Sequence, residues 1–173
     1  MVFKKLTINN VASYQVKEKK LLQAILKKSY EQSKGPMEDV EAKMEECRKM
    51  GKKFKYSKRN KYFMVQDFIT CLAVCHNVTP TVEDNVRNFQ ASSPDEIALV
   101  KIAESLGLML EERTLKEIVV KSSDSRKEVF KILQIFPFTS ASKRMGIIVQ
   151  HVKSSRIIFY MKGADTVMKE MVP

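Results

Sequence analysis

The second half of the chain alternates strand-forming runs with short polar connections, and this alternation restricts the possible folds more than any other feature of the sequence. The runs are rich in β-branched and aromatic side chains, which favour strands. They cover residues 108–110, 117–121, 127–136, 144–152 and 156–161. Connections as short as 122–125 and 153–155 join antiparallel rather than parallel strands. The pattern therefore predicts two consecutive hairpins within one antiparallel sheet.

The first half of the chain is predicted to supply helices. Residues 18–30 place leucines and an isoleucine on one helical face, and apolar residues occupy nearly every side of 62–76. The weaker assignments are a strand at 2–8, a helix at 37–50 and a polar surface connection at 79–88. With 173 residues and 44% hydrophobic content the chain is long enough to bury one core. We therefore expect a single α+β domain, residues 1–173, with helices flanking an antiparallel sheet.

Residues 93–96 carry a nearly complete signal for the start of a helix, and Gly107 supplies its stop. Ser93 is a suitable N-cap, Pro94 suits the first helical position, and Glu96 stands three residues after the cap. This spacing is that of a capping box, in which the glutamate accepts a hydrogen bond from the N–H of the cap residue. Glu96 thus has two interpretations. It caps its own helix, or its carboxylate accepts a hydrogen bond from the amino group of a ligand.

The connection 137–143 between two predicted strands has an unusual composition. Phe136 and Phe138 flank a proline, small hydroxylated residues follow, and Lys143 and Arg144 come last. One interpretation is a hairpin whose aromatic side chains fill the core and whose cations are solvated. The other is a binding loop, because a phenylalanine face and a lysine five residues later can hold a flat heteroaromatic ring that bears phosphates.

The three cysteines, Cys47, Cys71 and Cys75, are an odd number in a chain without an apolar signal peptide. Cys71 and Cys75 lie four residues apart on a predicted helix, with His76 beside them, a spacing that fits part of a metal site. No second pair of ligands accompanies them, so we expect buried free thiols of a cytosolic protein. No apolar run approaches the roughly 20 residues of a membrane span. We predict neither metal ligands nor catalytic residues in the chain.

The net charge of +11 is concentrated in the first third of the chain. Residues 1–61 contain 17 Lys and Arg against 7 Asp and Glu, whereas residues 62–173 contain 14 against 13. The densest block, 49–61, interleaves cations with Phe54 and Tyr56, a composition that can follow a nucleic-acid backbone or an anionic lipid surface. Its poor apolar periodicity equally fits a solvated, mobile insertion within residues 15–60.

Three blocks of the sequence carry a resemblance to a known family. They are QASSPDE at 90–96, FPFTS followed by KRM between 136 and 145, and YMKGAD at 160–165. In this order and spacing they resemble the nucleotide-binding domain of P-type ATPases of the phospholipid-transporting branch, the flippases. The string CHNVTP at 75–80 is most similar to the class II members of endomembranes. The resemblance covers nearly the whole chain except about residues 15–60.

The resemblance implies roles for several residues at the adenine end of ATP. Phe138 would stack on the adenine ring, a contact worth about 1–3 kcal/mol for base–aromatic pairs. Glu96 would accept a hydrogen bond from the adenine amino group. Ser140 and Lys143 would line the mouth of the pocket.

The resemblance also implies how the rest of the nucleotide is held. Lys162 would lie along the adenine and ribose and favour the phosphates, and Gly163 would let the backbone approach closely. Mg²⁺ would bind mainly through the phosphates and outside this chain. The domain would present the γ-phosphate to an aspartate on a separate phosphorylation domain, without catalysis of its own.

At the level of the whole protein, the resemblance implies a translocase that couples ATP hydrolysis to phospholipid movement between leaflets. The chain would be a cytosolic piece of a membrane ATPase of the Golgi or endosome, cut from a longer protein. Its partners would be ATP, the phosphorylation and membrane domains, and phospholipid as the transported substrate, but not nucleic acid. From the residues alone, two alternatives stay open: a basic nucleic-acid-binding module and a module that binds another protein.

Overall fold

The computed structural model describes residues 5–8, 12–32, 48–51, 61–84 and 86–171 of the chain. These fall into two compact units, within Lys5–Asp67 and within Phe68–Pro173. Most of the expected helix at 37–50 and of the basic block at 49–61 lies outside the described residues.

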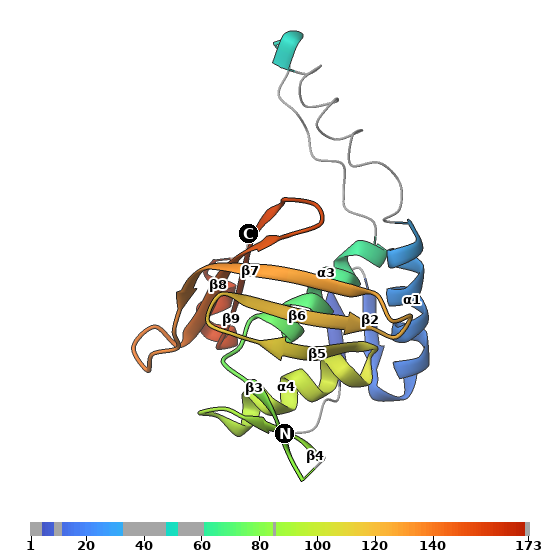
Figure 1. Cartoon of the computed structure of the whole chain (residues 1–173). Helices are drawn as coiled ribbons and strands as arrows, with labels where there is room; N and C mark the ends of the chain where they lie inside the picture. Colours follow the sequence, from blue (N-terminus) through green and yellow to red (C-terminus); the bar gives the residue numbers. More distant parts are fainter. Residues whose placement is uncertain (1–4, 9–11, 33–47, 52–60, 85, 172–173) are drawn as a thin grey trace. The chain divides into compact units, whose positions relative to one another are not determined.

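The larger unit is built on a five-stranded antiparallel sheet (Figure 1). Its strands are β5 (Leu108–Arg113), β6 (Glu117–Ser122), β7 (Lys127–Phe136), β8 (Arg144–His151) and β9 (Ile157–Gly163). They are hydrogen-bonded in sequence order, β5-β6-β7-β8-β9, so every connection is a hairpin. This confirms the predicted hairpins and the α+β class, and β7 begins and ends at the expected residues.

The alternation of side chains along the strands separates a buried face from an exposed face. Ile118, Val120, Ile147 and Val149 are all at most 1% exposed and point to the buried face. A bulge between Ile132 and Gln134 shifts the register of β7, so that Phe136 lies opposite Gly146.

The exposed face places Phe136 against Phe159, with ring centroids 5.9 Å apart in an edge-on arrangement. Phe136 remains 46% exposed and Phe138 remains 61% exposed. The interpretation in which both aromatic side chains fill the core is therefore wrong.

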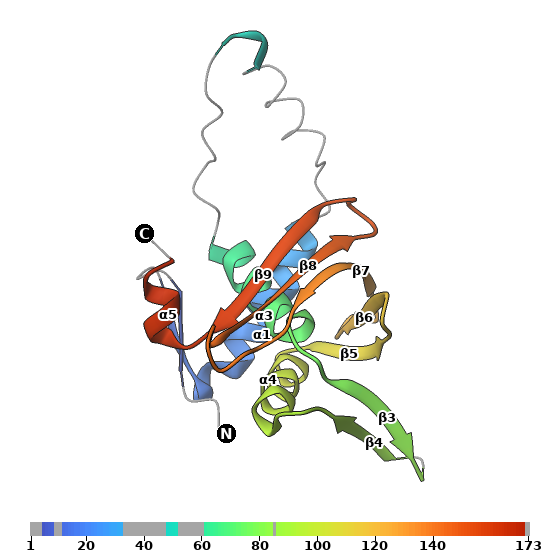
Figure 2. The same ribbon diagram turned by 90° about the vertical axis from the view of Figure 1, so that its left-hand side faces the viewer.

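Helix α4 (Pro94–Ser105) packs beside β5 (Figure 2). The predicted cap is confirmed, because the Ser93 Oγ accepts a hydrogen bond from the Asp95 N–H at 3.2 Å and Pro94 is the first helical residue. Val100 and Ala103 are buried, and Gly107 has φ +105° just after the helix, a conformation that favours glycine. The second half of the capping box is wrong, because the carboxylate of Glu96 bonds elsewhere.

The larger unit contains two further elements. The hairpin of β3 (Thr79–Glu83) and β4 (Val86–Gln90) projects away from the sheet in Figure 2. We expected a surface connection here, and the strands escape sequence reasoning because they bury almost none of their side chains. Helix α5 (Asp165–Lys169) follows β9.

The smaller unit contains the hairpin β1 (Lys5–Ile8) and β2 (Ala12–Gln15), the 3₁₀ turn η1 (Val16–Glu18) and helix α1 (Lys19–Gln32). Leu22, Ile25 and Leu26 of the predicted helical face are buried, whereas Leu21, which was assigned to the same face, is 48% exposed. Strand β2 was not expected. Helix α3 (Lys61–Val74) belongs to both units, and no described side chain from Tyr62 to His76 is exposed. Among the described helices none is long and apolar enough to cross a membrane.

Candidate functional site

The strand order of the sheet gathers residues from distant parts of the sequence at one end. In an antiparallel sheet with hairpin connections, alternate strands run in the same direction. Strands β5, β7 and β9 therefore run in the same direction and finish at Arg113, Phe136 and Gly163, with β5 ending level with Phe130, six residues before the end of β7. We call the end where they finish the site end, and the other end, with turns 122–126 and 151–156, the far end. The site end carries all the residues predicted for the β7–β8 connection and for β9.

Two of the predicted residues are in direct contact at the site end. The Lys162 ammonium group donates a hydrogen bond to Glu96 Oε1 at 2.9 Å, across 66 residues of sequence. The Lys162 and Glu96 side chains are 23% and 13% exposed, so the ion pair is largely shielded from water. The contact explains why Glu96 does not return to its own helix cap. A charged partner offers this carboxylate a stronger hydrogen bond than the backbone N–H of Ser93 does.

The chain that leaves α3 brings Asn77 to this ion pair, and His76 holds the chain in place there. His76 is fully buried, and its Nε2 donates to the Ala73 carbonyl at 2.8 Å while its Nδ1 accepts from the Val78 N–H at 3.0 Å. Burial, and then the positive charge of Arg113, lower the pKa of His76 to about 3. The neutral ring therefore fixes the chain as it leaves the helix, and the Asn77 N–H reaches Glu96 Oε2 at 3.4 Å.

The β7–β8 connection presents its side chains to solvent at the site end. Phe138 and Ser140 are exposed, and Lys143 is exposed with φ +48°. A hydrogen bond from the Lys143 N–H to the Thr139 carbonyl at 2.8 Å closes the turn. A left-handed backbone is uncommon for a residue other than glycine, and such residues cluster at functional sites. An exposed aromatic ring and a lysine held in this conformation fit the binding-loop interpretation.

Gly163 ends β9 opposite Arg144. A Cβ at this position would stand 2.9 Å from the Arg144 Cβ and 2.9 Å from the Lys143 carbonyl oxygen. The Ala164 N–H donates to the same carbonyl at 3.0 Å. The neighbouring strand thus requires glycine here, and this contact fixes Lys143 relative to Lys162.

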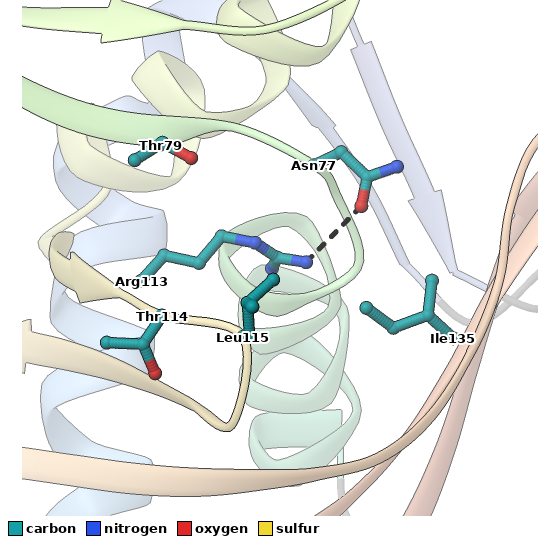
Figure 3. A pocket seen from close by; sticks show the side chains of 6 residues that line it. All are labelled: Asn77, Thr79, Arg113, Thr114, Leu115 and Ile135. Carbon is teal, nitrogen blue, oxygen red and sulfur yellow. Dashed lines mark hydrogen bonds between the residues drawn. The ribbon is translucent and has the colours of Figure 1, made fainter.

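A cavity of about 400 Å³ lies next to Arg113, and none of the residues predicted for the site lines it. Its walls come from the start of β3, the β5–β6 turn and the end of β7 (Figure 3). The lining residues are Asn77, Thr79, Arg113, Thr114, Leu115 and Ile135. Figure 3 shows the Arg113 guanidinium directed at Asn77, and its Nη2 donates to Asn77 Oδ1 at 3.3 Å. Asn77 thus joins the cavity to Glu96.

The cysteines of the larger unit do not form a metal site with His76. Cys75 is buried, and its thiol lies 3.9 Å from the Met145 carbonyl and 3.8 Å from the Tyr160 carbonyl. Both ring nitrogens of His76 are engaged with backbone groups. Cys71 and Cys75 form no disulfide, and Cys75 is buried as predicted whereas Cys71 is half-buried. Within the described residues, no group of three or more His, Cys, Asp or Glu side chains is placed to hold a metal ion.

Sequence reasoning missed two residues of this site, Asn77 and Arg113. We treated Asn77 only as a helix stop, and we ended the expected strand at Leu110 although β5 continues past a bulge to Arg113. Strand direction alone does not place Arg113 here, because the register aligns it through Ile118 with Phe130, six residues before β7 ends. The hydrogen bond to Asn77 brings Arg113 to Glu96.

Comparison with known families assigns the chain to a class. The profile described as "P-type ATPase, cytoplasmic domain N" matches residues 64–170. The match covers most of the larger unit, including every strand of the five-stranded sheet. The chain therefore belongs to the P-type ATPases, as their cytoplasmic N domain.

The similar curated proteins narrow the class. "Phospholipid-transporting ATPase NEO1" of Saccharomyces cerevisiae is 50% identical over 117 residues, which are 67% of this chain and 10% of that protein. "Probable phospholipid-transporting ATPase IIB" of Homo sapiens is 35% identical over 191 residues, covering 99% of this chain and 17% of that protein. "Probable phospholipid-transporting ATPase tat-5" of Caenorhabditis elegans is 44% identical over 112 residues, 62% of this chain and 10% of that protein. The chain thus spans 10% to 17% of the length of these relatives.

Proposed function

We propose that the chain binds ATP through its adenosine portion at the site end of the sheet. Phe138 stacks on the adenine ring, Glu96 accepts from the adenine amino group, and Lys162 lies along the nucleotide toward its phosphates. Ser140 and Lys143 line the mouth of the pocket. Gly163 holds the lysine-bearing ends of β8 and β9 close together.

The observation that supports the proposal most is the convergence of a carboxylate, a lysine and an exposed aromatic ring at one end of the sheet. An aromatic face with 61% exposure has no structural role in the core, but it offers a stacking platform for a base. An ordered cation beside it attracts phosphate.

The ion pair between Glu96 and Lys162 leaves room for a ligand. A carboxylate accepts about four hydrogen bonds. Here Oε1 takes the Lys162 ammonium group at 2.9 Å and Oε2 takes only the long bond from the Asn77 N–H at 3.4 Å. An adenine amino group can therefore bind Oε2 while Lys162 stays in place. A carboxylate is acceptor-only, which favours a donor on the base.

The phosphates extend from this site toward solvent and toward other domains of a longer protein. The chain offers them lysine ammonium groups, which act as point charges. Mg²⁺ binds ATP mainly through its phosphates and through groups outside this chain. A separate phosphorylation domain supplies the aspartate that takes the γ-phosphate, so this domain contributes positioning rather than bond-breaking chemistry.

In the whole protein this step drives phospholipid translocation. The names of the relatives support this assignment, since each is called a phospholipid-transporting ATPase. The chain is then the cytosolic nucleotide-binding part of a translocase of endomembranes, and the lipid binds elsewhere in the protein. The isolated chain is expected to bind nucleotide without hydrolysing it.

Calorimetric titration of the chain with ATP, ADP and AMP tests the proposal. Few phosphate ligands are present, so we expect a Kd near the millimolar range, about −4 kcal/mol. AMP should bind nearly as well as ATP, because the adenosine end dominates the contacts. A thousandfold preference for ATP over AMP, or no binding of either, would contradict the proposal.

A further inference from the structure

One cation at the site end, Arg113, has an incomplete set of hydrogen bonds. Arg113 donates from Nη2 to Asn77 Oδ1 at 3.3 Å, a long bond. Its Nη1 is buried and has no hydrogen-bond partner among the described residues. A buried donor without a partner is costly, and a guanidinium group has several donors in a fixed plane. Such a group in the wall of a cavity is suited to a ligand that brings an acceptor.

The position of Arg113 relates it to the base rather than to the phosphates. Asn77 contacts both groups, since its N–H bonds Glu96 and its side-chain oxygen bonds Arg113. The carboxylate of Glu96 is also close enough to act electrostatically on Arg113. A donor and an acceptor therefore stand side by side at the inner end of the site. The cavity that Arg113 lines, about 400 Å³, opens between the exposed Leu115 and the end of β7.

Adenine carries the complementary pattern on its edge. Its amino group is a donor, and the ring nitrogens on either side of it, N1 and N7, are acceptors. We propose that Arg113 donates a hydrogen bond to the ring nitrogen beside the amino group, so that Arg113 and Glu96 together select adenine. This inference rests on the proposed function, because it takes Glu96 as the acceptor for the amino group.

The same pair of residues rejects the 6-oxo purines. Guanine and hypoxanthine place an oxygen acceptor where adenine has its amino group. That oxygen would face the carboxylate of Glu96, leaving two acceptors opposed. A site built on a matched donor and acceptor therefore discriminates more strongly than stacking on Phe138, which every base can satisfy.

The test removes the acceptor from the ligand and the donor from the protein, separately and together. Wild type and Arg113→Met are titrated with AMP, 1-deaza-AMP, 7-deaza-AMP and IMP. Arg156→Met is the matched control, because Arg156 is exposed in the β8–β9 turn at the far end. Arg113→Lys, which keeps one cationic donor, provides a second variant if Arg113→Met does not fold. Melting curves establish folding for each protein.

We expect one of the two deaza analogues to bind wild type about five- to tenfold more weakly than AMP, the effect of one hydrogen bond from a charged donor. Arg113→Met should bind AMP more weakly by the same factor and should no longer distinguish that analogue from AMP. IMP should bind wild type worse than AMP, and the Arg156→Met control should match wild type throughout.

Two results would overturn the inference, and they have different meanings. If wild type binds AMP and both deaza analogues equally, Arg113 does not contact the ring, although the proposed function stands. The same conclusion follows if Arg113→Met keeps the discrimination of wild type. If wild type does not bind AMP at all, the proposed function fails and the role of Arg113 fails with it.

Discussion

The two ends of the five-stranded sheet differ in where the hydrogen-bond partners of their polar groups come from. At the far end several charged groups have local partners. Arg126 Nε donates to Asp124 Oδ2 at 2.5 Å within the β6–β7 turn, and Asp124 also accepts from the Ser122 hydroxyl. Glu128 and His151, on neighbouring strands, pair at 2.5 Å, and His151 bonds Ser154 at 2.7 Å. These contacts are sufficient to explain the residues as turn and strand stabilisers.

At the site end the polar groups come from distant segments and are not fully matched. The Glu96–Lys162 pair spans 66 residues and the Arg113–Asn77 bond spans 36. Arg113 keeps a buried donor without a partner in the described structure, and Phe138 exposes 61% of its surface. Native proteins satisfy almost all of their buried polar groups, so each departure calls for an explanation. The site end therefore differs from the far end in joining distant segments and in combining an exposed aromatic ring with an incompletely paired cation.

The largest predicted difference between the two ends is in how the free energy of unfolding depends on pH. The folded-state pKa of His76, about 3, lies below its ordinary value of 6.5. As the pH falls from 6.5 toward about 3, His76 takes up a proton in the unfolded chain but stays neutral in the folded chain. Stability should therefore fall by up to about 1.4 kcal/mol per pH unit for this one proton.

The far end should respond only at lower pH. The hydrogen bond from His151 lowers the pKa of Glu128 below its ordinary value of 4.5, so its contribution is present above that value and is lost as pH falls through the lower folded pKa. Urea unfolding at pH 6, 5 and 4 checks both statements. His76→Gln should flatten the slope between pH 6 and 5, whereas Glu128→Gln should leave that slope intact. An unchanged slope in His76→Gln would contradict the assignment.

Removal of the exposed aromatic ring should give the next largest effect, on binding. Phe138→Ala should weaken ATP and AMP binding by about 1–3 kcal/mol, the range for loss of base stacking. The melting temperature should change little because the ring is 61% exposed. Phe159→Ala is the control, since Phe159 is 54% exposed on the same sheet but pairs with Phe136. Equal losses of affinity in both variants would indicate a general effect on the sheet.

Changes at Glu96 should affect binding and stability by smaller and separable amounts. Glu96→Gln keeps an acceptor but loses the charge, so ATP affinity should fall several-fold at little cost in stability. Glu96→Ala should weaken binding further and lower stability by about 0.5–1.5 kcal/mol. Glu104→Ala removes another ion pair of α4, the one with Arg87 at 2.7 Å, and should leave affinity unchanged. Wild-type affinity in Glu96→Ala would restrict Glu96 to a structural role.

The two ends also offer a matched pair of strained residues, with the smallest expected effect. Lys143 has φ +48° at the site end and Ser155 has φ +54° at the far end. Glycine at either position should raise stability by up to about 1 kcal/mol through relief of backbone strain. Only Lys143→Gly should also weaken ATP binding. Thermal melts and titrations of both variants check this, and a loss of affinity in Ser155→Gly would break the comparison.

Local sequence patterns predicted the elements that are specified by a few neighbouring residues. The cap at Ser93, the stop at Gly107 and the hairpins of β6 through β9 depend on spacings of a few residues. The hairpin of β3 and β4 was missed, because strands with exposed, polar side chains lack the alternation that marks a buried face. The fold class was thus accessible, but the outlying hairpin was not.

The candidate site was accessible only in part. Family resemblance pointed to Glu96, Phe138 and Lys162, but the partner of Glu96 lies 66 residues away, so a capping spacing gave the wrong hydrogen bond. Arg113 was missed because a bulge after Leu110 extends β5 beyond its apolar run. Both errors concern contacts between segments that are distant in the sequence.

The central claim, that the site end binds the adenosine part of ATP, is tested most directly by a map of backbone amide NMR shifts during titration of the chain with AMP. We expect the shifts to concentrate at Asn77, Glu96, Arg113, Phe138 to Lys143, and Lys162 to Ala164. The far-end turns 122–126 and 151–156 should not respond. Shifts confined to the far end or to the basic block 49–61, or no shifts at millimolar AMP, would contradict the account.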